Sequence, residues 1–108
     1  MSHETDFLSD LVLLRNDPGL VTEIEQHALK GNPHAQYALG LIYAEGRGVS
    51  IDLSRSWAWL TLAVMQGDRE AETLRNIVGI DLTDREYQDG KSLAADLEQA
   101  IQSGPDVH

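Results

Sequence analysis

The sequence predicts an all-α domain of about six helices, and three observations support this fold class. Apolar residues recur at helical spacing through most of the chain. No stretch alternates apolar and polar residues for long enough to form a β-strand. Local start signals divide the chain into helix-sized segments and place N-caps at Asp17, Asn32, Asp52, Asp68 and Thr83. The 108 residues have room for one such domain.

Residues 1–31 are expected to form two N-terminal capping helices. The apolar face of the first consists of Phe7, Leu8, Leu11, Val12 and Leu14. Asp17 and Pro18 then end this helix and start the second, because aspartate suits the N-cap position and proline the first helical position. Gly31 is the residue expected to end the second helix.

Residues 32–67 are expected to form a helix pair joined by a turn that contains Gly46 and Gly48. The apolar stripe of the first helix, residues 33–45, consists of Ala35, Ala38, Leu39, Ile42 and Tyr43. Gly40 lies inside this helix, where glycine costs roughly 1 kcal/mol relative to alanine. We therefore expect Gly40 to allow the close approach of a neighbouring helix.

The second helix of this pair is expected to be buried on several sides, because residues 57–65 are apolar almost all round. Trp59 is assigned to the core. Trp57 points in a different direction from Trp59 on a helix, so the two rings form no common stacking platform. We expect Trp57 to pack on a flanking helix.

Residues 68–108 are expected to form a partial second helix pair and a C-terminal capping helix. The helix at 69–79 is predicted to turn Ala71, Leu74, Ile77 and Val78 toward the core. The last helix starts with the capping-box sequence Thr83 to Glu86. It continues with a narrow seam, partly of small residues, made by Tyr87, Gly90, Ala94, Leu97 and Ile101. Such a seam suits close helix packing, and a homodimer through it is a prediction.

An internal repeat connects the two helix pairs. The residues around Gly31 and Ala35 recur 36 positions later around Gly67 and Ala71, and one helix pair fits a unit of that length. The stretch 35–71 resembles the Sel1-like repeat, a relative of the tetratricopeptide repeat. The resemblance rests on Ala35, Leu39, Gly40, Tyr43, Gly46, Gly48, Val49, Asp52, Trp59, Ala63, Gly67 and Ala71. The second unit departs from the family pattern, with Asn76 and Gly79 in place of the expected glycine and tyrosine.

The resemblance implies a short right-handed α-solenoid of helix-turn-helix repeats with capping helices. It also implies a protein-interaction module, often in bacterial systems, with no cofactor and usually no catalysis. We therefore expect a non-enzymatic adaptor that binds a protein or peptide through its concave face.

In tetratricopeptide-like folds the first helix of each pair lines the concave groove, which here means helices 33–45 and 69–79. The candidate partner-binding residues on these helices are Gln36, Tyr37, Leu41, Ala44, Glu72, Arg75 and Asn76, with Ile77 beside them. Tyr37 and Leu41 lie one turn apart and are expected to form an apolar anchor, with Arg75 supplying charge. The alternative, in which flanking helices cover Tyr37 and Leu41, stays open.

The charge balance argues against nucleic-acid and membrane partners. Eighteen acidic and eight basic residues give a net charge of −10, which repels phosphates and anionic lipids. No apolar run approaches the roughly 20 residues of a membrane span, and nothing resembles a signal peptide, so a cytoplasmic location is expected. Because the acids are spread along the chain, they favour a role in solubility. An acidic inhibitor of a basic partner remains an alternative.

Motifs for catalysis and metal binding are missing from the sequence. The chain has no cysteine, and His27 and His34 without a converging carboxylate do not define a zinc site. Glu70 and Glu72 point in different directions on a helix and make a poor acid/base pair. No GxSxG or phosphate-binding loop occurs. A small ligand-binding or hydrolytic helical protein is kept as the second alternative.

Overall fold

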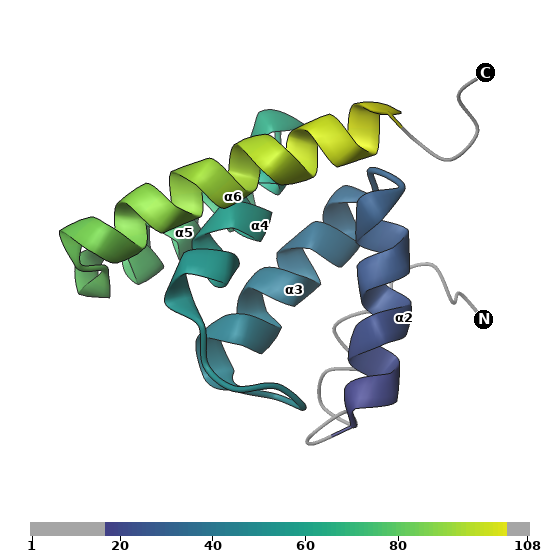
Figure 1. Cartoon of the computed structure of the whole chain (residues 1–108), viewed down its shortest axis with the longest axis horizontal. Helices are drawn as coiled ribbons and strands as arrows, with labels where there is room; N and C mark the ends of the chain where they lie inside the picture. Colours follow the sequence, from purple (N-terminus) through teal and green to yellow (C-terminus); the bar gives the residue numbers. More distant parts are fainter. Residues whose placement is uncertain (1–16, 104–108) are drawn as a thin grey trace.

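The computed structural model describes residues 17–103, which form five α-helices and no β-strand (Figure 1). The helices are α2 (Pro18–Leu29), α3 (Pro33–Glu45), α4 (Leu53–Met65), α5 (Arg69–Asp81) and α6 (Asp84–Ser103). The prediction of an all-α chain is confirmed for this part. The apolar helix predicted around residues 7–14 lies outside the described residues, so the total of about six helices stays a prediction.

Every described helix begins next to the N-cap that the sequence predicts. The cap bonds run to Asp17 Oδ1 from the Gly19 amide (2.9 Å), to Asn32 Oδ1 from His34 (2.8 Å), to Asp52 Oδ1 from Arg55 (3.0 Å) and to Asp68 Oδ1 from Ala71 (3.1 Å). The capping box of α6 is also confirmed. The Glu86 amide donates to Thr83 Oγ1 at 3.1 Å, and the Thr83 amide donates to Glu86 Oε1 at 2.9 Å. These bonds satisfy amides that have no partner within their own helix.

Helices α3 and α4 pack closely because Gly40 has no side chain. A Cβ atom at this position would collide with the side chain of Leu60. The Ser56 hydroxyl donates to the Gly40 carbonyl at 2.7 Å in the same buried contact. The expectation that Gly40 allows a neighbouring helix to approach is confirmed.

The core lies along α3 and α4 in two clusters. The first holds nine buried residues from α2, α3 and α4: Val21, Ile24, Ala28, Ala35, Ala38, Leu39, Ile42, Trp59 and Leu62. The second holds Leu60, Ala63, Ala71 and Val78 from α4 and α5. Trp59 is 1% exposed, as expected of a core residue. Ile77 is 56% exposed, so the prediction that it faces the core is wrong.

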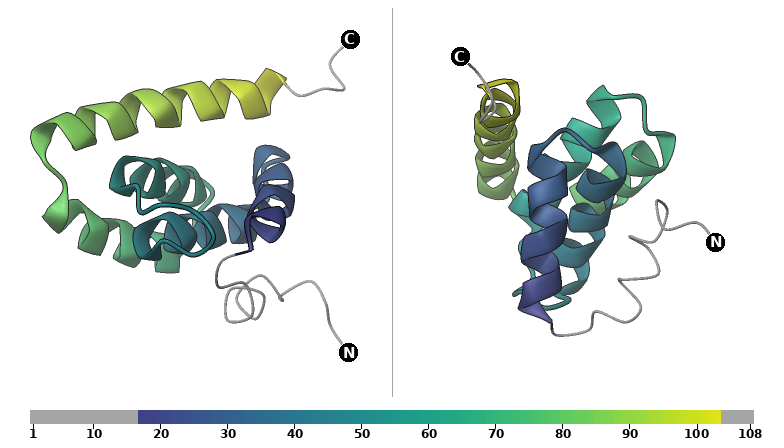
Figure 2. Two further views of the ribbon diagram at one scale, coloured as in Figure 1. Left: turned by 60° about the horizontal axis from the view of Figure 1, so that its bottom comes forward. Right: turned by 90° about the vertical axis from the view of Figure 1, so that its right-hand side faces the viewer.

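Helix α6 crosses back over α4 and does not pair with α5. In Figure 2, α4 lies between α6 on one side and the layer of α3 and α5 on the other. Gly90 allows this approach, since a Cβ there would lie 3.2 Å from both the Ser54 carbonyl oxygen and Trp57 Cε3. The Trp57 and Tyr87 rings meet edge to face, with centroids 5.2 Å apart. The prediction that Trp57 packs on a flanking helix is confirmed.

The sequence of α5 differs from that of α3 at the positions through which α3 packs against the helix that follows it. On α3, the residues next to α4 include Leu39 and Gly40, which bury against it and let it approach. The residues 36 positions later on α5 are Arg75 and Asn76. A charged side chain and a bulkier amide cannot form the same close apolar contact. The helix after α5 packs on α4 in place of α5. A right-handed solenoid stays a prediction.

The small-residue seam of α6 is used within the chain. Gly90 and Ala94 are buried, and Gly90 contacts α4. Leu97 and Ile101 pack against the first core cluster. A homodimer through this seam would require α6 to leave α4.

Candidate functional site

A shallow hollow of about 290 Å³ lies between α3 and α5. Tyr37 contributes the α3 wall, and Glu70, Thr73, Leu74 and Ile77 contribute the α5 wall. The four α5 residues fall at positions i, i+3, i+4 and i+7, so they share one helix face. We call this site the α3–α5 hollow.

The apolar part of the α3–α5 hollow is open to solvent. Ile77 is 56% exposed, and Ile80, one turn further along α5, is 81% exposed. Tyr37 and Leu74 are partly buried and pack against the second core cluster. Partly buried side chains such as Tyr37 and Leu74 next to an exposed apolar side chain are typical of anchor sites in protein interfaces.

The charges around the α3–α5 hollow are acidic. Burial raises the pKa of Tyr37 above its ordinary value of 10.0, and the carboxylates of Glu70, Asp68 and Glu45 raise it further. Glu45 has a partner in Arg47, at 2.6 Å. Within residues 17–103 no ion pair involves Glu70. The hollow therefore presents a carboxylate beside an apolar surface.

Of the seven predicted partner-binding residues, Tyr37 alone lines the α3–α5 hollow. Gln36 is 1% exposed and held inside the protein. Its Nε2 donates to the Ala28 carbonyl at 3.1 Å, and its Oε1 accepts from Gln66 Nε2 at 2.8 Å. These bonds give Gln36 a structural role that joins α2, α3 and the end of α4.

The other predicted residues are placed in different surroundings. Leu41 packs against the first core cluster, and Ala44 packs against the second. Arg75 lies over the Trp57 ring, with its guanidinium carbon 5.5 Å from the ring centroid, and donates to Thr61 Oγ1 at 3.3 Å. Its charge is directed at α4 and not into the hollow. Glu72 and Asn76 are exposed on α5 but do not line the hollow.

The sequence-based choice of site residues missed Glu70, Thr73 and Leu74. The repeat itself contained the missing signal, because Thr73 lies 36 residues after Tyr37 and Ile77 lies 36 residues after Leu41. Strict use of this offset leads to two residues that line the hollow.

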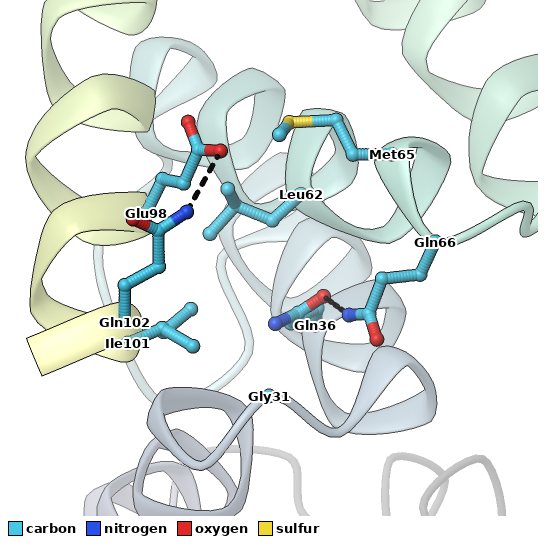
Figure 3. A pocket seen from close by; sticks show the side chains of 8 residues that line it. All are labelled: Gly31, Gln36, Leu62, Met65, Gln66, Glu98, Ile101 and Gln102. Atoms are coloured by element: carbon cyan, nitrogen blue, oxygen red, sulfur yellow. Dashed lines mark hydrogen bonds between the residues drawn. The ribbon is translucent and has the colours of Figure 1, made fainter. Parts of the chain in front are cut away.

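A second hollow, of about 210 Å³, lies where α6 passes the α2–α3 turn and the end of α4 (Figure 3). It is lined by Gly31, Gln36, Leu62, Met65, Gln66, Glu98, Ile101 and Gln102. Leu62 and Ile101 provide apolar walls, and Gln102 Nε2 approaches Glu98 Oε2 at 3.4 Å. The volume is below the roughly 300–1,000 Å³ of ordinary small-molecule sites. The lining contains no nucleophile next to a base.

The described residues hold neither a cluster of metal-ligating side chains nor a helix suited to a membrane. Between residues 17 and 103, no three histidine or acidic side chains gather as a metal site would require. In the same part of the chain, no helix combines the length and apolar character needed to cross a bilayer.

Comparison with known proteins identifies the central helix pair. Residues 33–68, which cover α3, α4 and the turn after them, match the family model described as Sel1 repeat. The chain is 34% identical over 70 residues to the alginate biosynthesis protein AlgK of Azotobacter vinelandii. That match covers 65% of this chain and 15% of AlgK, so the chain spans a small part of the relative's length. No solved structure matches the chain significantly.

Proposed function

Since residues 33–68 are a Sel1 repeat, we propose that this chain is a non-enzymatic module that binds another protein through the α3–α5 hollow. Sel1 repeats generally mediate protein–protein interactions. The observation that carries the proposal is the exposed Ile77 beside the partly buried Tyr37, on the two helices that open the successive repeat units. Apolar side chains exposed on rigid elements provide binding energy without a large cost in ordering.

The anchor that we propose consists of Tyr37 and Ile77. Leu41 was the expected partner of Tyr37, but it is not among the residues that line the α3–α5 hollow. Ile77 occupies the corresponding position one repeat later and is open to solvent. It extends the apolar surface of Tyr37 across the hollow.

A photo-crosslinking residue placed at Thr73 in the full chain tests this proposal in the native host. Thr73 is exposed in the wall of the hollow, and its hydroxyl donates to the carbonyl four residues earlier at 3.3 Å. Thr22 on α2 is a matched control, since it is also exposed and makes the same kind of bond at 3.1 Å. We expect a discrete crosslinked protein from position 73 that is lost with Ile77→Ser. Crosslinks that form equally from position 22, or that persist with Ile77→Ser, would contradict the proposal.

The second hollow does not favour the small-molecule alternative. Its lining combines apolar side chains with amides and a single carboxylate, without a nucleophile beside a base. It has the volume for a single side chain or a small fragment. Alginate biosynthesis is the role that the name of AlgK gives, and it is not proposed for this chain.

A further inference from the structure

The α3–α5 hollow combines an apolar strip with the carboxylate of Glu70, which forms no ion pair within residues 17–103. Glu70 and Ile77 share one face of α5 and are seven residues apart, which corresponds to about 10 Å along a helix. Thr73 and Leu74 lie between them, so the surface from the carboxylate to the exposed isoleucine is continuous.

The arginines nearest to this surface along the chain do not belong to its lining. Arg75 lies against Trp57 and Thr61 on α4. Arg47 pairs with Glu45 at 2.6 Å. Within residues 17–103, neither Arg75 nor Arg69 lines the hollow. Glu70 is therefore the charged group that a bound chain would meet there.

The acidic residues in the first turn of α5 can also be explained by helix stability, without a binding role. Glu70 and Glu72 both lie in the first turn, where negative charge stabilises the positive end of the helix dipole. That role is served by any carboxylate in the turn. It does not require Glu70 to line an apolar hollow opposite Tyr37.

We propose, as a refinement that rests on the function above, that the α3–α5 hollow takes a basic and apolar polypeptide segment. An aliphatic side chain of this segment packs on Tyr37, Leu74 and Ile77, and a lysine or arginine about 10 Å away meets Glu70. The apolar contact supplies most of the affinity. The negative charge of Glu70 favours a positively charged partner and raises the association rate. The net charge of −10 adds a long-range attraction for the same class of partner.

Three synthetic 16-residue peptides provide the probes. One is an amphipathic helix of leucine and lysine, the second replaces lysine by glutamate, and the third replaces leucine by serine. Binding of each labelled peptide to the full chain is followed by fluorescence anisotropy at about 0.15 M salt, where charges beyond about 8 Å are largely screened. We expect the leucine–lysine peptide to bind more tightly than either of the other two.

Two variants and two matched controls separate site binding from general attraction. We expect Ile77→Ser to weaken the leucine–lysine peptide about tenfold, and Glu70→Gln to weaken it about two- to fivefold. The controls are Ile51→Ser, at a 63% exposed isoleucine in the α3–α4 loop, and Asp96→Asn, at an exposed acid on α6. Both controls are expected to change affinity by less than about 1.5-fold. Circular dichroism checks that all four variants remain folded.

The outcomes distinguish this inference from the proposed function. In one outcome, the leucine–glutamate peptide binds as tightly as the leucine–lysine peptide and loses affinity with Ile77→Ser. That result would overturn the inference about charge but would still support the binding surface. Two results with the leucine–lysine peptide would show non-specific attraction and overturn the inference. One is that Ile77→Ser leaves its affinity unchanged, and the other is that Asp96→Asn weakens its binding as much as Glu70→Gln does. Crosslinking from position 73 tests the surface independently of either result.

Discussion

Gly40 determines how closely α3 and α4 pack, although it has no side chain of its own. The Leu60 side chain occupies the space in which a Cβ at Gly40 would lie, and the Ser56 hydroxyl reaches the Gly40 carbonyl. Gly79 on α5 is the opposite case, because a Cβ there would meet nothing within 4 Å. Gly40 is therefore required for helix packing, and Gly79 is not.

The first prediction compares alanine at these two glycines. Gly40→Ala should lower the free energy of unfolding by about 1–3 kcal/mol, because the new methyl group overpacks the α3–α4 contact. Gly79→Ala should raise it by about 0.5–1 kcal/mol, because alanine restricts the unfolded chain and no contact opposes it. Urea titration monitored by tryptophan fluorescence measures both. Equal effects of the two substitutions would contradict the packing role of Gly40.

The second prediction concerns the ionisation of Tyr37. Burial, reinforced by three nearby carboxylates, raises its pKa in the folded protein above 10.0. The protonated phenol is thus favoured by folding, and this stabilisation is complete below pH 10 and is lost as the pH rises through the folded pKa. We expect the free energy of unfolding to fall above pH 10, and to fall less steeply in Tyr37→Phe. Denaturation at a series of alkaline pH values tests this, and identical slopes would contradict it.

At the scale of elements, local sequence signals determine where each helix starts, and tertiary contacts determine which helices pack together. The N-caps and the capping box were predictable because each involves residues two or three positions apart. The path of α6 was not, because it depends on Gly90 meeting Trp57, more than thirty residues away. The burial of Gln36 was equally hidden, since periodicity does not reveal that the Ala28 carbonyl and Gln66 satisfy its amide.

The candidate site could be predicted only in part for the same reason. Tyr37 was found because it lies off the apolar stripe of its helix. Arg75 also lies off the stripe, but Trp57 attracts its guanidinium to α4. A side chain that lies outside the apolar stripe of its own helix can still pack against a neighbouring helix.

The third prediction addresses the start of α6. Thr83→Ala removes the side chain that accepts from the Glu86 amide, and should lower the free energy of unfolding by about 1 kcal/mol. Thr22→Ala is the control, because Thr22 is exposed and bonds only within α2, and its effect should stay within about 0.5 kcal/mol. Hydrogen exchange should also accelerate at the first amides of α6. Unchanged exchange there would argue against the capping role.

At the scale of the whole molecule, α6 makes the described part a closed unit. The seam that could join two chains already faces α4. A homodimer through the seam, which stays a prediction, would therefore have to exchange α6 between chains. The cytoplasmic location expected from the sequence also stays a prediction.

The fourth prediction follows from this closure. A dimer formed through the seam should exchange slowly with the 11.9 kDa monomer, because α6 must first leave α4. The sample is diluted and then followed for several hours by size exclusion with light scattering. This measures the masses of the monomer and the dimer and the rate at which they exchange. A dimer that equilibrates within seconds would have to use another surface.

The route of α6 also has a consequence for folding. In a simple repeat array each unit contacts only its neighbours, so the ends can unravel independently. Here Ile101, near the end of α6, lies beside Gly31 at the end of α2, and α4 contacts α6 along the way. This contact closes a chain segment of about seventy residues, which adds a loop-closure cost to folding. Because α2 and α6 contact each other directly, we expect fraying at one of these helices to weaken the contacts of the other.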